Sequence, residues 1–483
     1  MNSNDEIPAY QLYINGGWQA GDSGQYVRYS PANGKEVARF SLASATNAEE
    51  AITAARNAFD SGVWSDLDPA DRAAVLFRFA DLLVAHRERL AQLECATNGA
   101  PIKYSRAFVD SAAKTFRFFA GILRTLHGET HAFGGRGIGL TLREPVGVAS
   151  LILPWNFPLG ELAWKLAPAL AVGCTAVIKP DSKTAATALE VGPLLQEAGL
   201  PDGVFNAVVG EVSEIGTTLT GHHMVDAVSF TGSSASGRRV MESASARVKP
   251  LHLELGGKSP LIIMDDADVQ RAAQDAAFGI FWHNGQVCTA CSRLLVHESV
   301  HDDFLAELQS AAAGFKIGDP FDESTDLGPV IDDHHLATIV EHIERASAEG
   351  AHLLLDGREG VPEGGAYLGP TIFTEVASSM RIAREEVFGP VAAVLKVSSL
   401  GHAIEIANDS DYGLGAGIWT RDINAALLAA RKIQSGSFWI NGYGAERLEL
   451  SWGGYKQSGY GRELGEAAFE VFTRTKSVHI AQA

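Results

Sequence analysis

The segment VGVASLILPWNFPLGELAWKLAPALAVGCTAVIKP, residues 146–180, decides the fold class of this chain. It contains two short apolar runs, at 146–153 and at 174–180, and a helix-like segment follows each of them. A third run of the same kind, VDAVSFTG, occupies residues 225–232. Strand, turn and helix in repeated succession predict parallel α/β layers.

The same alternation extends to both sides of this segment. Upstream, apolar residues recur at helical spacing over 48–59, where Thr46 and Asn47 offer N-cap oxygens, and again over 70–93. Downstream, strand-like runs favour a second α/β domain: SPLIIM (259–264), SRLLVH (292–297) and PVAAVLKV (390–397).

Two glycine-rich or alternating segments, 121–142 and 472–480, interrupt this pattern. We expect both segments to be extended and to lie outside the two α/β layers, where they pair with each other or with another subunit.

Length and charge exclude several classes of protein. The 483 residues include 39 Lys and Arg against 58 Asp and Glu, a net charge of −19, and 46% of the residues are hydrophobic. A chain of this length holds two to four domains at about 100 to 200 residues each. The hydrophobic content argues against disorder, and the negative charge without a basic run argues against nucleic acid as a partner.

Cysteine content and hydropathy predict a cytoplasmic protein. Four cysteines in so long a chain form no disulfide framework and indicate a reducing compartment. The N-terminal stretch MNSNDEIPAY lacks the pattern of a secretory signal. The longest apolar stretch, 167–178, has 12 residues, which is short of the roughly 20 that span a bilayer, so we expect no membrane association.

Several short motifs fail in their context, and we expect no metal site. His297, Glu298 and His301 match H-E-x-x-H but would straddle a strand–helix junction, which argues against a metallopeptidase. The sequence GGKS at 256–259 lacks the first glycine of a phosphate-binding loop, and no G-x-G-x-x-G occurs. The histidine pairs 222–223 and 334–335 have no partners at ligand spacing and are expected at the surface.

Four further motifs are too specific for core packing, and together they resemble the aldehyde dehydrogenase superfamily from about Tyr13 to Lys476. They are PWNFP (154–158), LELGGKSP (253–260), NGQVC (284–288) and EEVFGP (385–390). The resemblance implies two Rossmann-like α/β domains and a small β oligomerisation arm. It assigns residues 1–122 and 146–256 to NAD(P) binding, 257–457 to catalysis, and 123–145 and 470–483 to the arm.

The resemblance also implies three catalytic residues. Cys288 matches the family's nucleophile, and a thiolate suits this chemistry because it adds to carbonyls and later leaves from a thioester. Asn156, with the backbone N–H of Cys288, matches the oxyanion donor. Glu254 matches the base that activates water to hydrolyse the thioester, which favours release of a free acid over transfer to coenzyme A.

The cofactor implied by the resemblance is NAD or NADP. Ser182 stands where many NAD-specific members carry a glutamate that binds both ribose hydroxyls. Because Ser182 and the following Lys183 do not repel a 2′-phosphate, the sequence leaves NADP open. The residues matched to cofactor binding are Trp155, Lys179, Ser182, Gly232, Ser233, Leu255, Glu386 and Phe388.

Substrate identity stays open between two classes of aldehyde. Aromatic residues occupy positions where betaine-aldehyde and aminoaldehyde dehydrogenases place an aromatic box, and the carboxylate of Glu161 would also suit a cation. The alternative is a general hydrophobic tunnel for aryl or alkyl aldehydes. The tunnel residues are Phe157, Glu161, Trp164, Trp282, Val287, Thr289 and Trp452.

The resemblance further implies a homodimer or homotetramer, without deciding between them. A rival from another class is a structural or binding protein that has lost catalysis on the same fold. The presence of Cys288, Glu254 and Asn156 together argues against that rival.

Overall fold

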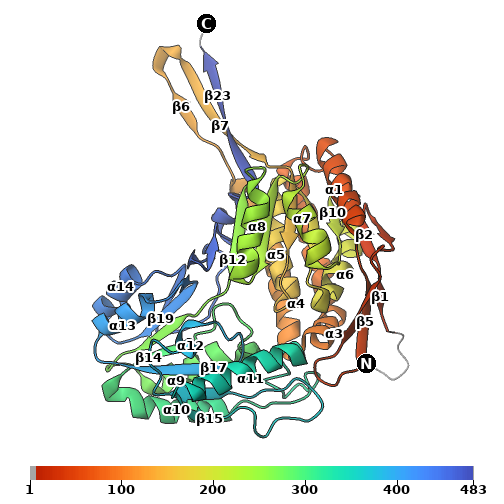
Figure 1. Ribbon diagram of the computed structural model, residues 1–483. Helices are drawn as coiled ribbons and strands as arrows, with labels where there is room; N and C mark the ends of the chain where they lie inside the picture. The colour runs from red at the N-terminus through yellow and green to blue at the C-terminus, as the bar shows by residue number, and fades with distance from the viewer. Residues whose placement is uncertain (1–6, 482–483) are drawn as a thin grey trace.

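The computed structural model describes residues 7–481 as two α/β bodies and a projecting arm (Figure 1). The expectation that no secretory signal is present falls largely on residues 1–6, which lie outside the described part of the chain. Within residues 7–481, no helix combines the length and the apolar character needed to cross a membrane.

The first body is built on an eight-stranded sheet. The three runs expected as strands are confirmed as β8 (Val148–Ile152), β9 (Thr175–Lys179) and β11 (Ala227–Gly232), which run parallel. The strand order is β22-β12-β11-β8-β9-β10-β2-β3. The remaining strands are β22 (Gly459–Tyr460), β12 (Leu251–Leu255), β10 (Phe205–Ala207), β2 (Leu12–Ile14) and β3 (Gly17–Gln19).

Helices cover both faces of this sheet. Alternate residues of β8 face opposite layers: Ala149 and Leu151 share one core with α2 to α6, whereas Val148 and Ile152 share another with α1, α7 and α8. Burial on both faces explains why these strands are continuously apolar. The helices are α1 (Ala45–Asp60), α2 (Pro69–Ala85), α3 (Arg87–Asn98), α4 (Ile102–Ile122), α5 (Pro158–Val172), α6 (Ala185–Glu197), α7 (Val212–Gly221) and α8 (Ser234–Ser245).

Two details of the helices differ from the sequence expectation. The N-cap of α1 is Ser44, and Asn47 is the third helical residue, whose side chain bonds back to the Ser44 backbone in a capping box. The segment 70–93 is not one helix, because the chain turns at His86, which ends α2 and begins α3.

The second body repeats the parallel architecture. Its sheet has the order β15-β16-β17-β14-β13-β19-β20. The expected runs are confirmed as β13 (Pro260–Ile263), β14 (Arg293–His297) and β17 (Val391–Val397), joined by β15 (His352–Leu355), β16 (Thr371–Thr374), β19 (Gly415–Trp419) and β20 (Ser437–Ile440). The helices are α9 (Val269–Phe281), α10 (His301–Ala313), α11 (Asp333–Ala348), α12 (Arg381–Arg384), α13 (Leu400–Asn408) and α14 (Ile423–Lys432). Because β14 ends at His297 and α10 begins at His301, the H-E-x-x-H residues do straddle a junction.

The two irregular segments pair with each other, which is one of the two arrangements expected from the sequence. Strand β23 (Thr473–Ala481) runs antiparallel to β7 (Gly137–Pro145), and β6 (Thr130–Ala132) pairs with the other edge of β7. Together they form the arm that extends from the first body (Figure 1). Two small sheets complete the fold: β1 (Ala9–Tyr10), β5 (Glu36–Ser41) and β4 (Gln25–Tyr29); β18 (Tyr412–Gly413) and β21 (Tyr455–Lys456).

After the second body the chain returns to the first. Strand β22 pairs with β12, so residues around Gly459 belong to the first sheet. The assignment of residue ranges to domains of separate function stays a prediction.

Candidate active site

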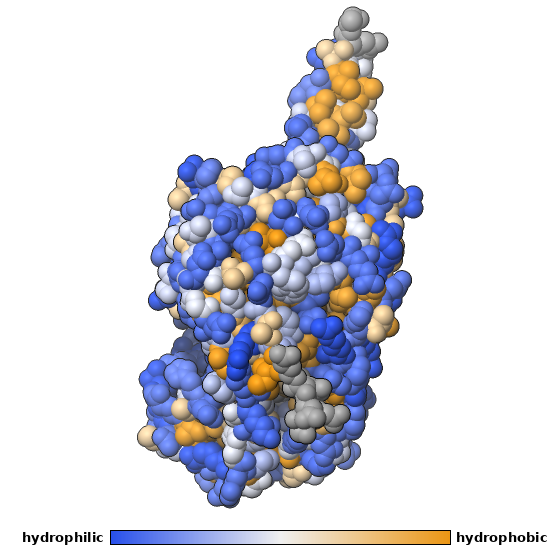
Figure 2. Space-filling view, turned by 90° about the vertical axis from the view of Figure 1, so that its right-hand side faces the viewer, coloured by the Kyte–Doolittle hydropathy of each residue, from blue (hydrophilic) through white to orange (hydrophobic). Residues whose placement is uncertain are grey.

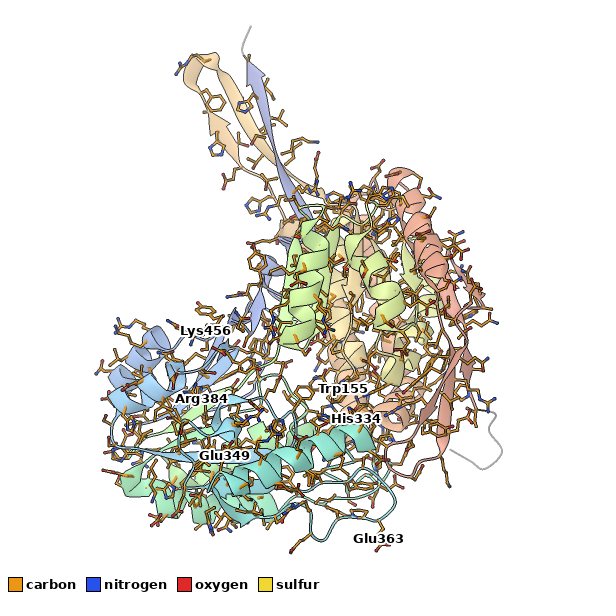
Figure 3. The ribbon with its side chains drawn as sticks, in the orientation of Figure 1. Trp155, His334, Glu349, Glu363, Arg384 and Lys456 are labelled. Atoms are coloured by element: carbon orange, nitrogen blue, oxygen red, sulfur yellow. The ribbon has the colours of Figure 1, made fainter. Side chains whose placement is uncertain are left out.

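A cavity of about 390 Å³ opens where the two bodies meet. Along the chain, the first sheet grows from β8 to β9 and β10 on one side, and then returns with β11 and β12 on the other. Parallel sheets bind ligands at the carboxyl ends of the strands where this order reverses. The residues that line the cavity lie there, and Figure 3 shows Trp155 between the two bodies.

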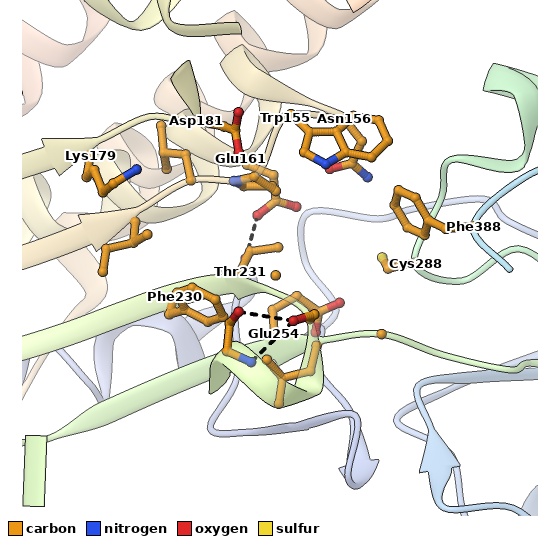
Figure 4. A pocket seen from close by; sticks show the side chains of 18 of the residues that line it. Trp155, Asn156, Glu161, Lys179, Asp181, Phe230, Thr231, Glu254, Cys288 and Phe388 are labelled. Carbon is orange, nitrogen blue, oxygen red and sulfur yellow. Dashed lines mark hydrogen bonds between the residues drawn. The ribbon is translucent and has the colours of Figure 1, made fainter. Parts of the chain in front are cut away.

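Cys288 enters the cavity from the second body (Figure 4). Between α9 and Cys288 the chain makes a tight turn in which His283, Asn284 and Gly285 all have positive φ. A Cβ atom at Gly285 would lie 2.2 Å from the carbonyl oxygen of Gly389, so the turn requires glycine there. The turn brings the Cys288 thiol to the cavity wall.

Cys288 is the least buried of the four cysteines. It is half-buried, whereas Cys95, Cys174 and Cys291 are buried. Burial and the negative charge of nearby Glu254 raise the pKa of the Cys288 thiol well above its usual range. Cys291 does not line the cavity, and its thiol points to the carbonyl of Ala276.

Glu254 is fully buried on β12 and faces the same cavity. Burial, reinforced by the charges of Glu463 and Glu161, raises the pKa of its carboxyl well above the ordinary value. One carboxyl oxygen accepts a hydrogen bond from Nε1 of Trp452 at 3.4 Å. The other is buried without a partner in the described structure, so it is available to a substrate or a water molecule.

Asn156 lies in the turn between β8 and α5 and is buried. Its Nδ2 donates to the carbonyl of Gln286 at 2.9 Å, and its own carbonyl contacts Nε2 of His283 at 2.9 Å. The side-chain amide has two hydrogens, so one remains for an oxygen atom in the cavity. Asn156, Cys288 and Glu254 thus line one cavity (Figure 4).

Seven of the eight predicted cofactor residues line this cavity: Trp155, Lys179, Gly232, Ser233, Leu255, Glu386 and Phe388. Ser233 caps α8, so the first amides of that helix face the cavity, where an anion is favoured. Lys179 is buried, and its Nζ donates only to the carbonyl of Pro180 at 3.3 Å in the described structure. Glu386 accepts from the Gly257 N–H at 3.0 Å, and burial raises its pKa to about 7.

The eighth predicted residue, Ser182, does not line the cavity, whereas its neighbour Asp181 does. The Lys183 ammonium is held by Asp332 at 2.7 Å in the second body. The charged residues that line this end of the cavity are Lys179 and Asp181, which Figure 4 shows away from Cys288.

The predicted tunnel aromatics form two pairs. Phe157 stacks on Trp282 with ring centroids 5.7 Å apart, and Trp164 meets Trp452 edge to face at 5.5 Å. Of the other predicted tunnel residues, Val287 is half-buried beside Cys288 and Thr289 is buried.

Glu161 lines the cavity, but its carboxylate already has hydrogen-bond partners within the protein. Its Oε2 accepts from Lys165 at 3.2 Å and from Thr231 at 2.9 Å. Lys165 also donates to Glu463, so the lysine faces two carboxylates. The structure therefore embeds Glu161 in a buried ionic cluster rather than leaving it as a free charge.

The sequence patterns predicted neither this cluster nor the position of His335. The spacing of Glu161 and Lys165 on one helix is a signal for an ion pair, but Glu463 lies 298 positions beyond Lys165 and gave no such signal. The expectation that His335 is a surface residue is wrong. It is half-buried, packs against Trp155 and contacts the Phe388 carbonyl at 2.8 Å.

Comparisons with known proteins identify the family of this chain. The model of the aldehyde dehydrogenase family matches residues 18–478. The chain is 41% identical to the betaine aldehyde dehydrogenase of Bacillus subtilis (strain 168), over 97% of the chain and 96% of that protein. It is 39% identical to the cytosolic 10-formyltetrahydrofolate dehydrogenase of Xenopus laevis, over 99% of the chain but only 54% of that longer protein.

Among solved structures, the NAD-dependent aldehyde dehydrogenase from Sinorhizobium meliloti superposes with a TM-score of 0.97 at 39% identity, over 99% of this chain and 97% of that one. A family match across nearly the whole chain, joined to these relatives and to this cavity, shows that the chain belongs to the aldehyde dehydrogenase family, a family of oxidoreductases acting on aldehydes.

Proposed function

We propose that the chain oxidises an aldehyde to a free carboxylic acid, with NAD or NADP as oxidant, through a thioester on Cys288. The observation that carries the proposal is the single cavity that Cys288, Asn156 and Glu254 share with seven expected cofactor residues. A partially exposed thiol, an amide donor and a buried carboxyl are the groups that this chemistry needs.

In the proposed mechanism, the Cys288 thiol loses its proton to water, and the resulting thiolate adds to the aldehyde carbon so that the carbonyl oxygen becomes an oxyanion. The remaining N–H of the Asn156 amide and the backbone N–H of Cys288 donate to that oxyanion. Hydride then leaves the tetrahedral carbon and a thioester remains. Glu254 takes a proton from water, the hydroxide displaces the thiolate, and the acid is released.

The residues present fit a nicotinamide dinucleotide. Its pyrophosphate suits the amides at the start of α8, and Lys179 has donors left for ribose hydroxyls. Bound there, the oxidised nicotinamide supplies the hydride acceptor. Ser182 and Lys183 admit NADP, whereas the carboxylate of Asp181 in the cavity and the engagement of Lys183 by Asp332 favour NAD.

For the substrate, we propose an amino- or trimethylammonium-aldehyde. Lys165 faces Glu161 and Glu463, and Glu254 adds a third carboxyl nearby, so carboxyls outnumber ammonium groups here. A cation is favoured by this excess of carboxyls, and the aromatic box that the resemblance implies would add cation–π contacts. Two of its rings, those of Trp164 and Trp452, are buried and pack edge to face on each other.

A panel of aldehydes, each with NAD and with NADP, tests both proposals through the absorbance of reduced nicotinamide. We expect turnover, with kcat/KM for an aminoaldehyde about 10-fold or more above that of a neutral aldehyde of equal length, because one or two cation–π contacts supply that much energy. A preference for neutral aldehydes would instead support the aryl or alkyl alternative. No turnover with any aldehyde and either cofactor would overturn the proposed activity.

The arm fits a role in assembly, and we propose a homodimer or homotetramer. Hydrophobic side chains gather along it (Figure 2), and its exposed apolar residues are Phe133, Ile138, Leu142 and Ile480. Exposed apolar patches of this kind mark interaction surfaces. We expect the double substitution Leu142→Asp with Ile480→Asp to shift the mass measured by light scattering towards the monomer. An unchanged mass would contradict this role.

The location stays a prediction from the sequence. The proposed nucleophile requires a reduced thiol, and all four cysteines are free in the structure. We therefore propose a cytoplasmic site of action.

A further inference from the structure

Arg28 on β4 is a buried cation held by backbone carbonyls. It is 4% exposed, and its Nε and Nη2 donate to the carbonyl of Thr97 at 2.9 and 2.7 Å. Nη2 also donates to the carbonyl of Ile331 at 2.7 Å. Burial lowers the pKa of this guanidinium, whereas the charges of Asp332 and Asp181 act on it in the opposite direction without a direct ion pair to Arg28 among the described residues. Burying a guanidinium that makes no direct ionic contact is costly, so we ask what its hydrogen bonds to these two carbonyls achieve.

One hydrogen-bond path leads from Arg28 to Asn156 through the second body. The carbonyl of Ile331, which Arg28 holds, belongs to the turn before α11, and the N–H of the same residue donates to Oε1 of Gln286 at 2.8 Å. The carbonyl of Gln286 accepts from Nδ2 of Asn156 at 2.9 Å. Arg28 is thus linked to the orientation of the Asn156 amide.

A second path leads from Arg28 to Asn156 through the first body. Arg28 holds the carbonyl of Thr97 at the end of α3, and the next residue, Asn98, donates from Nδ2 to two carbonyls. These are the carbonyl of Trp155 at 2.7 Å and that of Asn156 at 3.1 Å. The two paths form a closed circuit that ties the backbone and the side chain of Asn156 to one guanidinium.

We propose that Arg28 is a positioning residue that sets the Asn156 amide relative to Cys288 across the two bodies. The inference rests on the proposed function, in which Asn156 stabilises the oxyanion. Asn156 comes from the first body and Cys288 from the second, so their separation depends on how the bodies are held together. Misplacement by about 1 Å can cost about 100-fold in rate.

A double-mutant cycle between Arg28→Gln and Asn156→Ala tests this. We expect Asn156→Ala to lower kcat about 100-fold or more, as loss of an oxyanion donor does. Arg28→Gln should lower kcat about 10-fold by misplacing the donor, with the KM for cofactor and the dissociation constant for NAD, measured by tryptophan fluorescence, within about 2-fold of the parent. The double variant should match Asn156→Ala, because Arg28 then has no amide to position.

Arg72 provides a matched control. It is 6% exposed, belongs to the first body, and donates to the carbonyls of Ala171, Ser65 and Leu67, but has no path to Asn156. Arg72→Gln should lower thermal stability as Arg28→Gln does, while kcat per folded molecule stays near that of the parent. Added to Asn156→Ala, it should likewise leave kcat per folded molecule unchanged.

The outcomes separate this inference from the proposed function. If the effects of Arg28→Gln and Asn156→Ala multiply, or if Arg28→Gln leaves kcat unchanged, the inference is overturned and the role of Asn156 stands. If Asn156→Ala alone leaves kcat unchanged, the oxyanion role fails and the inference fails with it. Should Arg28→Gln not fold, Gln286→Met breaks the same circuit at buried Gln286, and the same lack of additivity is expected.

Discussion

Replacing Cys288 with alanine should abolish both the initial burst of reduced nicotinamide and the steady turnover that follows. We expect kcat to fall by about 10⁴-fold or more, the scale seen when a covalent nucleophile is removed. The reason is geometric as well as chemical, because Cys288 is the half-buried thiol at the cavity wall and the other three are buried. Stopped-flow absorbance with an aldehyde that the parent oxidises measures both phases.

Cys291→Ala is the matched control for this experiment. Cys291 lies three residues further on, is buried, and directs its thiol to the Ala276 carbonyl. Its loss should leave both phases intact. Burst and turnover that survive in Cys288→Ala, or disappear in Cys291→Ala, would contradict the assignment.

Labelling of Cys288 by a thiol reagent distinguishes an active enzyme from a protein that has lost catalysis on the same fold. An aldehyde together with the cofactor should protect Cys288 from the reagent if a covalent adduct forms there. A structural or binding protein on the same fold would show no such protection.

Replacing Glu254 with glutamine should leave the rapid burst but slow the steady turnover. Hydride leaves before water attacks the thioester, so the first phase does not need a general base. The second does, and loss of a general base typically costs about 10² to 10⁴-fold. The thioester should then accumulate on Cys288, where mass spectrometry of the quenched protein would detect it. Equal steady rates in the variant and the parent would refute the assignment.

The pH dependence follows from the environment of Glu254. Burial and two nearby carboxylates raise its pKa, so the basic carboxylate form is lost at a higher pH than for an exposed glutamate. The steady rate of the parent should therefore fall as the pH falls through this raised pKa. In Glu254→Gln the corresponding inflection should be absent.

Glu94→Gln is the matched control for the Glu254 experiment. Glu94 is also buried, with a pKa raised to about 7, but it accepts from the Leu159 N–H at the start of α5 and does not line the cavity. Its substitution should leave the ratio of burst to steady rate unchanged.

Local patterns predicted what depends on local sequence. The apolar runs at 146–153 and 174–180 became buried parallel strands, because residues covered on both faces must be apolar throughout. The motifs around Asn156, Glu254 and Cys288 led to residues that share one cavity, since each motif contains its own turn or strand end.

Features that depend on residues distant in the chain could not be predicted from local sequence. The sequence suggested that Glu161 has a free charge. In the structure its carboxylate accepts from Lys165 and Thr231, and Lys165 also donates to Glu463. Likewise, Lys183 looked free to meet a phosphate, but Asp332 comes from the other body. No local pattern of apolar and polar residues encodes such partners.

The pairing of β7 with β23 has a consequence for how the protein is made. Lys476 and Glu144, an ion pair on these strands, are 332 positions apart in the chain. On the ribosome, β7 therefore emerges long before its partner and presents an unpaired edge that carries Ile138 and Leu142. We expect the arm to form as one of the last steps of biogenesis, so nascent or truncated chains should be the species most prone to aggregate and most dependent on chaperones.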